Sequence, residues 1–462
     1  MALAALFACL VFIIWLIVRD CRLRKSVSYA VWVPTCLLLI LGSRPLSMWL
    51  AGGTLTPGTE ALGTMGNQEA TSLADQLFQL SVLGASLLIA YSRRVRWRKL
   101  LAANKPLLFF YLFFALSVLW SGDPFGSAKR LTKDFGLIFV ILVILTEKNP
   151  MEAIRAVYFR CAAVLFPLSV LFIKYFPDLG RSYTRGGELM LTGVTTQKNS
   201  LGEIVLVFGL FLIWDSLDIR PGVQKRLWAR MRWDRLVLLL MALWLLHISQ
   251  SKTALLCLAI AVALAFRGRF LSSKAASKAV LFGALSVPFL MFFTHDFNWI
   301  LRPIVEALGR NMTFTGRADI WEHITATTVN PLIGAGYWNF WGGTGGAAIV
   351  MAMKTPVPNA HCGYLDMYLD GGWTALALLL TVLLTSGLRL ANRVTAGEFE
   401  RVKFAVLIAA ILYNMSESIF ARLSPLWFTT LVALIDFPYL RTVATRATSK
   451  VSHAYRGALI TK

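Results

Sequence analysis

The sequence predicts an all-α polytopic membrane protein with one long loop outside the membrane. Two observations predict this class: the composition, and the way apolar residues recur along the chain. The chain is 57% hydrophobic and 15% charged, with a mean hydropathy of +0.64, whereas soluble proteins carry about 25% charged residues. A bilayer core needs roughly 20 apolar residues per helix, and runs near that length follow one another here. We therefore expect one transmembrane domain over residues 1–462.

Apolar runs separated by short polar connectors give about 12–13 transmembrane helices. The first run has no charged residues before it and no small-residue cleavage motif, so we expect a retained helix rather than a signal peptide. Runs of only about 13 residues are also compatible with partial or re-entrant segments. The expected segments lie near residues 2–18, 28–50, 73–91, 106–121, 127–146, 160–176, 201–217, 236–250, 254–266, 279–294, 362–388, 404–420 and 424–440.

The distribution of Lys and Arg predicts the orientation of these helices. With the N-terminus outside, most of the 46 Lys and Arg residues fall in cytoplasmic connectors, as the positive-inside rule requires. Residues 295–361 then form a large periplasmic loop, and the protein is expected in the bacterial inner (cytoplasmic) membrane. The cytoplasmic connectors of this topology are 19–27, 93–105, 147–160, 218–235, 267–278, 389–403 and 441–462.

The net charge of +22 does not indicate nucleic-acid binding, because the basic residues stand in short blocks between apolar runs. Such blocks anchor cytoplasmic loops against anionic lipid. The six cysteines include no CxxC pair, so neither a zinc site nor a disulfide framework is expected. We expect no metal and no cofactor.

A minority of basic residues falls on the outer side, where Lys and Arg are normally avoided. Any one of them is explained by contact with lipid phosphate or by snorkelling at a helix end. As a group, they favour convergence on an anionic substrate, since guanidinium groups bind phosphate in a bidentate manner. They are Arg44, Lys129, Arg130, Lys133, Lys174, Arg181, Arg185, Lys198, Lys252, Arg302, Arg310, Arg317, Lys354 and Arg422.

A basic outward cavity suits a lipid-linked diphosphate, whose head group lies at the outer leaflet. Transfer of a glycan from such a donor needs cations for the leaving diphosphate and a base for the acceptor hydroxyl. His361 is the candidate base, because it stands where the long outer loop re-enters the membrane and histidine titrates near neutral pH. An isolated interfacial histidine is otherwise a structural hydrogen-bonding residue.

Several motifs, taken in their order between residues 119 and 417, resemble the O-antigen ligase and Wzy polymerase (Wzy_C) superfamily, which includes exopolysaccharide-production proteins of the ExoQ type. An earlier stretch, Ser43-Arg44-Pro45-Leu46, is also similar to ExoQ-like members. The motifs are Trp120-Ser121-Gly122-Asp123-Pro124 for W-S-x-D-P, residues 193–202 for G-x-x-x-x-K/P-N-x-L-G, residues 249–253 for S-x-S-R-T, Thr315-Gly316-Arg317 with Trp321 for T-G-R-x-x-x-W, residues 330–336 for N-P-L-x-G-x-G, residues 359–372 around His361, and Asn414–Glu417 for N-x-x-E.

The resemblance implies an inverting, metal-independent glycosyltransferase of the GT-C type. It would take a glycan from undecaprenyl diphosphate at the periplasmic face. By motif position, Arg317 would bind the diphosphate and His361 would activate the acceptor. Lys252 stands where many members carry Arg and so lacks the bidentate fork. Cys362 replaces the usual Asn after the histidine.

Further candidates flank these positions. Lys198, Arg181 and Arg185 are predicted diphosphate ligands because they lie in or just before the loop that contains Asn199. Asn199 is equally compatible with helix capping. Glu417 and Asn414 interrupt an apolar run, which marks them as functional residues or as a partnered structural pair.

The resemblance leaves the acceptor open. A ligase would transfer the glycan to lipid A core or another terminal acceptor, and a polymerase would transfer it to a second lipid-linked repeat. A transporter or flippase for lipid-linked glycans is the alternative of another class, and it predicts repeat symmetry and ionisable residues near the middle of the membrane. No internal repeat is visible, and the polar residues gather at one face.

Overall fold

The expected apolar segments are helical in the computed structural model, which describes residues 1–52, 72–183, 187–217, 233–266, 273–293, 317–325, 327–354 and 357–437. Of these residues, the side chains of 291–293, 317–319 and 325 are not described. The helices are α1 (Ala2–Leu23), η1 (Tyr29–Val31), α2 (Trp32–Leu41), α3 (Leu46–Leu50), α5 (Leu73–Ser92), α6 (Trp97–Ala103), α7 (Lys105–Ser117), η2 (Val118–Trp120), α8 (Pro124–Leu145), α9 (Pro150–Tyr175), α10 (Pro177–Gly180), α11 (Lys198–Ser216), α12 (Trp233–Ser249), α13 (Lys252–Phe266), α14 (Lys274–Phe293), α16 (Arg317–Thr325), α17 (Thr344–Met353), α18 (Gly363–Ala391), α19 (Glu398–Tyr413) and α20 (Pro425–Leu434). Strands β1 (Arg181–Tyr183) and β2 (Leu189–Leu191) pair antiparallel.

The all-α polytopic fold is confirmed, but several predicted boundaries are wrong. The expected connector 147–160 is helical from Pro150, because Pro is well tolerated at the first position of a helix. The segment 28–50 is not one helix but η1, α2 and α3, with a break at Gly42–Pro45. The segment 404–420 ends at Tyr413, where Asn414 begins a turn.

Five described helices are long and apolar enough to cross a membrane: α1, α5, α9, α11 and α18. A sixth span is possible if α6 and the helix after it are one broken span, which bends by 93° at the break. The expected 12–13 spans exceed this number because α12, α13 and α20 are short, and because α8 carries Lys129, Arg130, Lys133 and Asp134.

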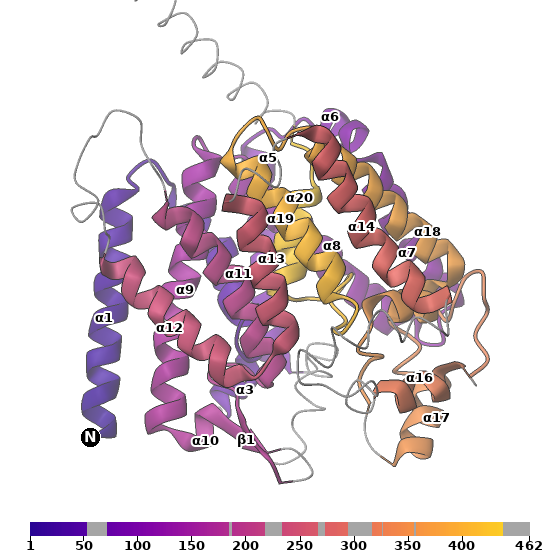
Figure 1. Ribbon diagram of the computed structural model, residues 1–462, viewed down its shortest axis with the longest axis horizontal. Coiled ribbons are helices and arrows are strands. Elements are labelled where there is room, and N and C mark those ends of the chain that lie inside the picture. Colours follow the sequence, from indigo (N-terminus) through magenta and orange to yellow (C-terminus); the bar gives the residue numbers. More distant parts are fainter. Residues whose placement is uncertain are drawn as a thin grey trace, which may run out of the picture.

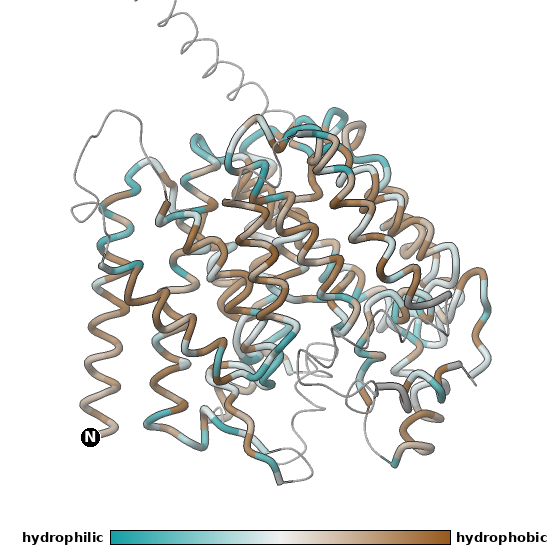
Figure 2. The backbone as a smooth tube through the Cα atoms, in the orientation of Figure 1, coloured by the Kyte–Doolittle hydropathy of each residue, from teal (hydrophilic) through white to brown (hydrophobic). Residues whose placement is uncertain are grey.

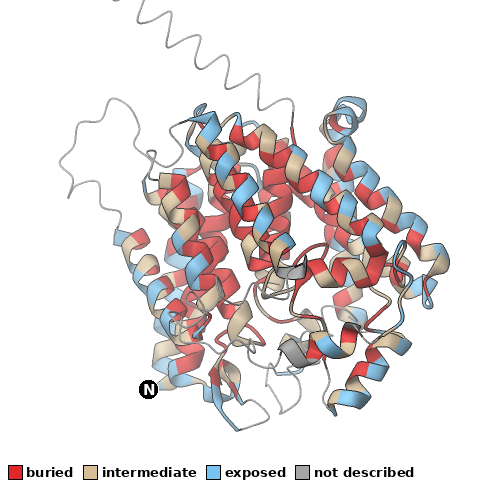
Figure 3. Cartoon of the chain, turned by 45° about the vertical axis from the view of Figure 1, so that its right-hand side comes forward, coloured by how far each residue is buried: buried red, intermediate tan, exposed pale blue. Residues whose placement is uncertain are grey.

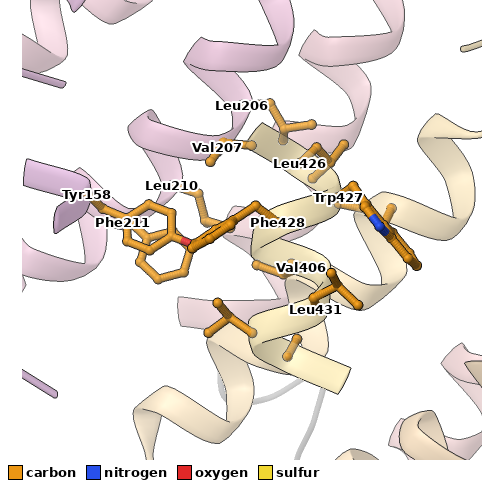
Figure 4. Packing of buried hydrophobic residues seen from close by; sticks show 14 of the residues in the cluster. Tyr158, Leu206, Val207, Leu210, Phe211, Val406, Leu426, Trp427, Phe428 and Leu431 are labelled. Carbon is orange, nitrogen blue, oxygen red and sulfur yellow. The ribbon is translucent and has the colours of Figure 1, made fainter. Parts of the chain in front are cut away.

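The core lies in the middle of the bundle, where α9, α11, α13, α19 and α20 pack together (Figures 1 and 3). α11 is buried on all sides between Leu201 and Leu212, so it has no polar face. Around α11 and α20 (Figure 4), Tyr158 stacks on Phe211 with ring centroids 3.8 Å apart. In contrast, only 11% of the apolar window of α1 and 17% of that of α5 is buried, so these helices lie at the periphery.

The connectors that were predicted to face outward meet at one end of the molecule. In Figure 1 this end is the lower edge, where α3, α10, β1, α16 and α17 lie, and Figure 2 shows hydrophilic residues there and at the opposite edge. Hydrogen bonds join the connectors: Trp120 Nε1 donates to Ile333 O at 3.2 Å, and the Thr253 and Ser416 hydroxyls lie 2.7 Å apart. We call this end the outer end and the opposite end the inner end.

A loop at residues 330–336 docks into a break in α18 and so fixes the outer end. The α18 backbone leaves helical geometry at Gly372, whose φ is +63°, a value that favours glycine. The freed backbone N–H of Trp373 donates to Pro331 O at 2.8 Å, and Gly336 N donates to Asp370 O at 2.9 Å. A Cβ on Gly334 would lie 2.4 Å from Gly371 N, so the approach of the two chains requires glycine.

Candidate active site

His361, Glu417 and Asn199 come together at the outer end, although the chain separates them widely. His361 Nδ1 lies 3.6 Å from Glu417 Oε2, and Asn199 Nδ2 donates to Glu417 Oε1 at 2.7 Å. The Glu417 carboxylate therefore has one oxygen fixed by an amide and the other facing the imidazole. His361 and Glu417 retain 24% and 15% side-chain exposure, so both are open to a ligand.

All three side chains line one cavity of about 90 Å³ between the N-terminus of α11 and the turn after α19. A cavity of this size is a gap between side chains that a reacting group could enter, and no whole sugar fits inside it. Other residues of its wall are Gln197, Ser200, Glu203, Trp338, Asn359, Tyr413, Ser418, Arg422 and Ser424.

The backbone holds His361 in a conformation that residues other than glycine rarely adopt. Its φ is +49°, and such a residue persists only where its surroundings determine it. Here the His361 N–H donates to Asn359 Oδ1 at 2.9 Å, and the carbonyl of Ala360 accepts from Trp321 Nε1 at 2.8 Å. Since Trp321 belongs to α16, this helix is attached next to the histidine.

The turn after α19 positions Glu417, and Asn414 shapes that turn. Asn414 Oδ1 accepts from the N–H groups of Ile419 and Phe420 at 3.0 and 3.1 Å, and its Nδ2 donates to Ala410 O at 2.8 Å. The Asn414 side chain is fully buried and therefore structural. Of the predicted pair, Glu417 faces the cavity and Asn414 supports the turn that carries it.

Arg422 is the residue of this cavity that the sequence did not single out. It was one of many outward basic residues, yet its side chain is only 6% exposed and its Nη2 lies 3.1 Å from Asp370 Oδ2. The guanidinium carbon stands 3.4 Å from the centre of the Trp338 ring, a cation–π contact. Its Nη1 is buried and, among the described residues, has no hydrogen-bond partner. A buried donor of this kind is expensive unless a ligand accepts from it.

Lys198 and Lys252 open α11 and α13, and neither side chain lines the cavity. Lys198 is the first residue of α11 and Lys252 the first of α13. The two helix starts approach closely, since a Cβ on Gly202 would lie 2.7 Å from Ser251 Cβ. Unpaired N–H groups and the helix dipole at such ends favour an anion, and each lysine adds a positive charge there.

The remaining predicted ligands are placed differently. Arg181 is not in the cavity wall: its Nε and Nη2 donate to Ile173 O at 3.1 and 2.9 Å, which binds the hairpin to the end of α9. Arg185 and Thr315 lie outside the described residues. Arg317 begins α16, one helical turn before Trp321, and its side chain is not described. The roles of Arg181, Arg185 and Arg317 as diphosphate ligands stay predictions.

Arg44, also in the outward basic set, is structural. Its side chain is buried and donates to Gly193 O at 3.1 Å and to the carbonyls of Thr195 and Leu179, so it holds the loop before α11. Burial lowers the pKa of Arg44 to about 10, which leaves it charged at neutral pH. Within the described residues, no three His, Cys, Asp or Glu side chains are grouped closely enough to hold a metal ion.

Comparison with known proteins gives one relevant similarity. No protein-family model matches the chain. Over 257 residues the chain is 26% identical to the exopolysaccharide production protein ExoQ of Rhizobium meliloti (strain 1021), and this alignment covers 54% of this chain and 55% of ExoQ. The chain thus matches about half the length of its curated relative. The long apolar helices indicate a multi-pass membrane protein, and over the matched residues the chain is similar to this exopolysaccharide production protein.

Proposed function

We propose that the protein is a glycosyltransferase that moves a glycan from undecaprenyl diphosphate to an acceptor hydroxyl at the outer end, on the periplasmic side of the inner membrane. The observation that carries this proposal is the contact between His361 Nδ1 and Glu417 Oε2, 3.6 Å apart, in a cavity that also contains Arg422. The similarity to an exopolysaccharide production protein supports the same class of reaction.

Glu417 would orient the imidazole of His361. At 3.6 Å, Nδ1 and Oε2 are too far apart for a hydrogen bond, and Nδ1 has no hydrogen-bond partner among the described residues. Once substrate binding closes this distance, the carboxylate would keep a proton on Nδ1, which leaves the other nitrogen free as a base. Asn199 donates to the second carboxylate oxygen at 2.7 Å, so the carboxylate cannot rotate away without losing a hydrogen bond. Nε2 of His361 is then the atom that accepts the proton.

The reaction would proceed in one displacement. The acceptor hydroxyl loses its proton to His361 Nε2 while its oxygen forms a bond to the anomeric carbon of the donor. The bond from this carbon to the diphosphate oxygen breaks, and its electron pair leaves with the lipid diphosphate. Because the acceptor attacks opposite the leaving group, the anomeric configuration inverts.

Cations would stabilise the negative charge that develops on the leaving diphosphate. Lys198 and Lys252 at their helix ends, Arg317 at the start of α16 and the free Nη1 of Arg422 are the groups available for this role. These groups supply the charge in this scheme, so the proposed reaction is independent of a metal ion.

The acceptor defines two versions of the reaction. A role in exopolysaccharide production, as named for ExoQ, is compatible with both versions. A polymerase would use a second lipid-linked repeat to supply the hydroxyl. An O-antigen ligase would instead use lipid A core. Incubation of the purified protein with donor and a native lipid extract separates these versions: a polymer still attached to undecaprenol identifies the polymerase, and glycan on a new anchor identifies the ligase.

The transferase itself is tested with purified protein in proteoliposomes, lipid-diphosphate donor and acceptor. We expect product from the natural sequence, about 10²–10⁴-fold less from His361→Gln, as for loss of a general base, and normal rates from the control His247→Gln. His247 lies in the last turn of α12, outside the cavity wall. Full transfer by His361→Gln would contradict the mechanism, and movement of donor across the membrane without transfer would favour a flippase.

A further inference from the structure

A second cavity, an apolar groove of about 460 Å³, opens between α2, α5 and α8. Its α8 wall is a single stripe in which residues recur at helical spacing, from Phe125 and Ala128 through Thr132 to Gly136 and Val140. The α2 and α5 walls are mostly aliphatic. Gly136 lets α8 approach α5 closely at the base of the groove, since a Cβ there would lie 3.3 Å from Leu83 Cδ1.

Two lysines give this lining its positive charge, and the uncharged polar residues Gln76, Gln79 and Thr132 also line it. Lys129 and Lys133 belong to the α8 stripe, one helical turn apart, in the outer half of the helix. Both are half-buried, and neither reaches a carboxylate within 4 Å among the described residues. Asp75 acts on Lys133 electrostatically from beyond ion-pair distance. The groove therefore combines a long apolar body with a cationic end.

The cationic end leads to the candidate active site. A narrow gap of about 10 Å³, walled by Arg130, Lys133, Trp338 and Leu423 among others, lies between the groove and the active-site cavity. Lys133 and Leu423 line both the groove and this gap, whereas Trp338 and Leu423 line both the gap and the cavity of His361. The three spaces are therefore neighbours, and the side chains of Lys133, Trp338 and Leu423 form the walls that they share.

A comparable groove on the other side of α8 lacks these features. It has a volume of about 330 Å³ and lies between α6, α7 and α8, with Phe135, Ile138 and Phe139 in its wall. No Lys, Arg, Asp or Glu lines it, and it shares no lining residue with the active-site cavity. Ordinary acyl chains would fill both grooves. The groove between α2, α5 and α8 differs in its two lysines and in the wall residues that it shares with the gap beside the active-site cavity.

We propose that the groove between α2, α5 and α8 binds the isoprenoid chain of the polyprenyl diphosphate donor, and that Lys129 and Lys133 bind its phosphates. The chain would lie along the apolar stripe, and the diphosphate would extend from the two lysines past Trp338 and Leu423 to Arg422, so that the anomeric carbon bonded to it stands beside His361. This inference rests on the proposed function for the identity of the ligand. It assigns the basic residues of α8, which the chemistry at His361 does not use.

Binding of the donor lipid is measured by native mass spectrometry of the full chain with undecaprenyl diphosphate as the probe. Undecaprenol, which lacks phosphate, and phosphatidylglycerol, which has a phosphate on acyl chains, are the comparison ligands. We expect undecaprenyl diphosphate to bind tightest. Lys129→Gln with Lys133→Gln should weaken it about tenfold or more, because two charge-assisted contacts are lost. Lys105→Gln, an exposed lysine at the start of α7, is the control.

The apolar body is tested with a matched pair of filling variants on α8. Ala128→Trp adds an indole to the proposed groove, and Ile138→Trp adds one to the uncharged groove. Only Ala128→Trp should weaken undecaprenyl diphosphate and raise the KM for the donor. An unchanged thermal unfolding midpoint in both variants shows that neither result reflects misfolding.

The possible outcomes separate this inference from the proposed function. Equal binding of phosphatidylglycerol and undecaprenyl diphosphate, or unchanged binding by the lysine and Ala128→Trp variants, would overturn the groove assignment even if glycan transfer occurs. Groove-dependent binding of undecaprenyl diphosphate by a protein that transfers no glycan would overturn the proposed function and leave the groove assignment in place.

Discussion

Buried arginines at the inner end of the bundle are paired with carboxylates of other helices, whereas most of the basic side chains described at the outer end are not. At the inner end, Arg24 binds Asp215 at 2.5 Å and Glu152 at 3.1 Å, and it also contacts Asp20. Arg160 binds Asp20 at 2.9 Å, and Arg235 binds Asp215 at 2.7 Å. Each arginine of this network meets a carboxylate of another helix, so the charges join α1, α9, α11 and α12 to one another.

At the outer end, most of the cations described have no such carboxylate. Arg44 and Arg181 are bound to backbone carbonyls, and Lys129 and Lys133 reach no carboxylate within 4 Å among the described residues. Arg422 is paired with Asp370 but keeps a buried Nη1 without a described partner. A closed network stabilises helix packing, whereas cations left open can bind an anion. The inner network thus stabilises the fold, and the open cations of the outer end support the proposal that this end binds the anionic donor.

The largest expected effect tests the inner network as a structural element. Asp215→Asn removes the carboxylate that Arg24 and Arg235 share. Breaking a buried ion pair leaves a charge uncompensated and costs about 3–5 kcal/mol. We expect a large fall in the thermal unfolding midpoint, whereas Asp178→Asn, at an exposed aspartate of α10, should leave it unchanged. If both variants unfold alike, the network does not hold the inner end together.

The opposite pattern is expected at the outer end. Glu417→Gln should slow glycan transfer by about 10²-fold, because the imidazole of His361 loses the carboxylate that orients it, while the unfolding midpoint changes little at a partly exposed residue. Glu417→Asp, which keeps the charge, should recover part of the rate. A loss of stability as large as that of Asp215→Asn, with transfer intact, would show that the two ends do not differ as we infer.

How far the sequence predicted this arrangement depends on the kind of signal. Apolar runs predicted the positions of the helices, because a segment that crosses a bilayer is recognised by its length and hydropathy. The boundaries were less accurate where polar residues continue a helix, as Glu152, Arg155 and Arg160 do in α9. These residues resemble a cytoplasmic connector in composition. Only their partners on other elements, Arg24 for Glu152, Trp214 for Arg155 and Asp20 for Arg160, explain why the first two are half-buried and Arg160 is buried.

The candidate site was predicted in part. Position at the end of the long loop indicated His361, and a carboxylate in an apolar run indicated Glu417, which lie together. Arg422 was named only as one of the outward basic residues, because its sequence context matches that of a residue in lipid contact, and Trp338 and Asp370 become its neighbours only in three dimensions. For Arg181 and Arg44, the sequence did not show the backbone carbonyls that accept hydrogen bonds from their guanidinium groups.

Arg422 permits a test of whether an ion pair at the outer end serves the fold or the substrate. Arg422→Gln alone leaves Asp370 unpaired, so its effect mixes stability with binding. The double variant Arg422→Gln/Asp370→Asn removes both charges and should recover the unfolding midpoint. We expect the KM for the donor to stay about tenfold above that of the natural sequence, consistent with one lost charge-assisted hydrogen bond. Recovery of donor KM together with stability would make Arg422 a structural residue like Arg24.

The smallest effect concerns Glu147, in the inner connector between α8 and α9. Burial opposes its ionisation, but hydrogen bonds from Ser28 and an ion pair with Arg93 bring the pKa of Glu147 below its usual value. Because the pKa is lower in the folded protein, this contribution to stability is complete above the unfolded pKa, about 4.5, and is lost as the pH falls through the folded pKa.

Glu147→Gln should therefore lower the free energy of unfolding at pH 7 by about 1–2 kcal/mol, which is measured as a lower thermal unfolding midpoint. Below pH 4 its curve should approach that of the natural sequence, while Glu398→Gln, at an exposed glutamate, should follow the natural sequence throughout. A deficit of equal size at both pH values would mean that the shape of the Glu147 side chain, and not its charge, stabilises the inner end.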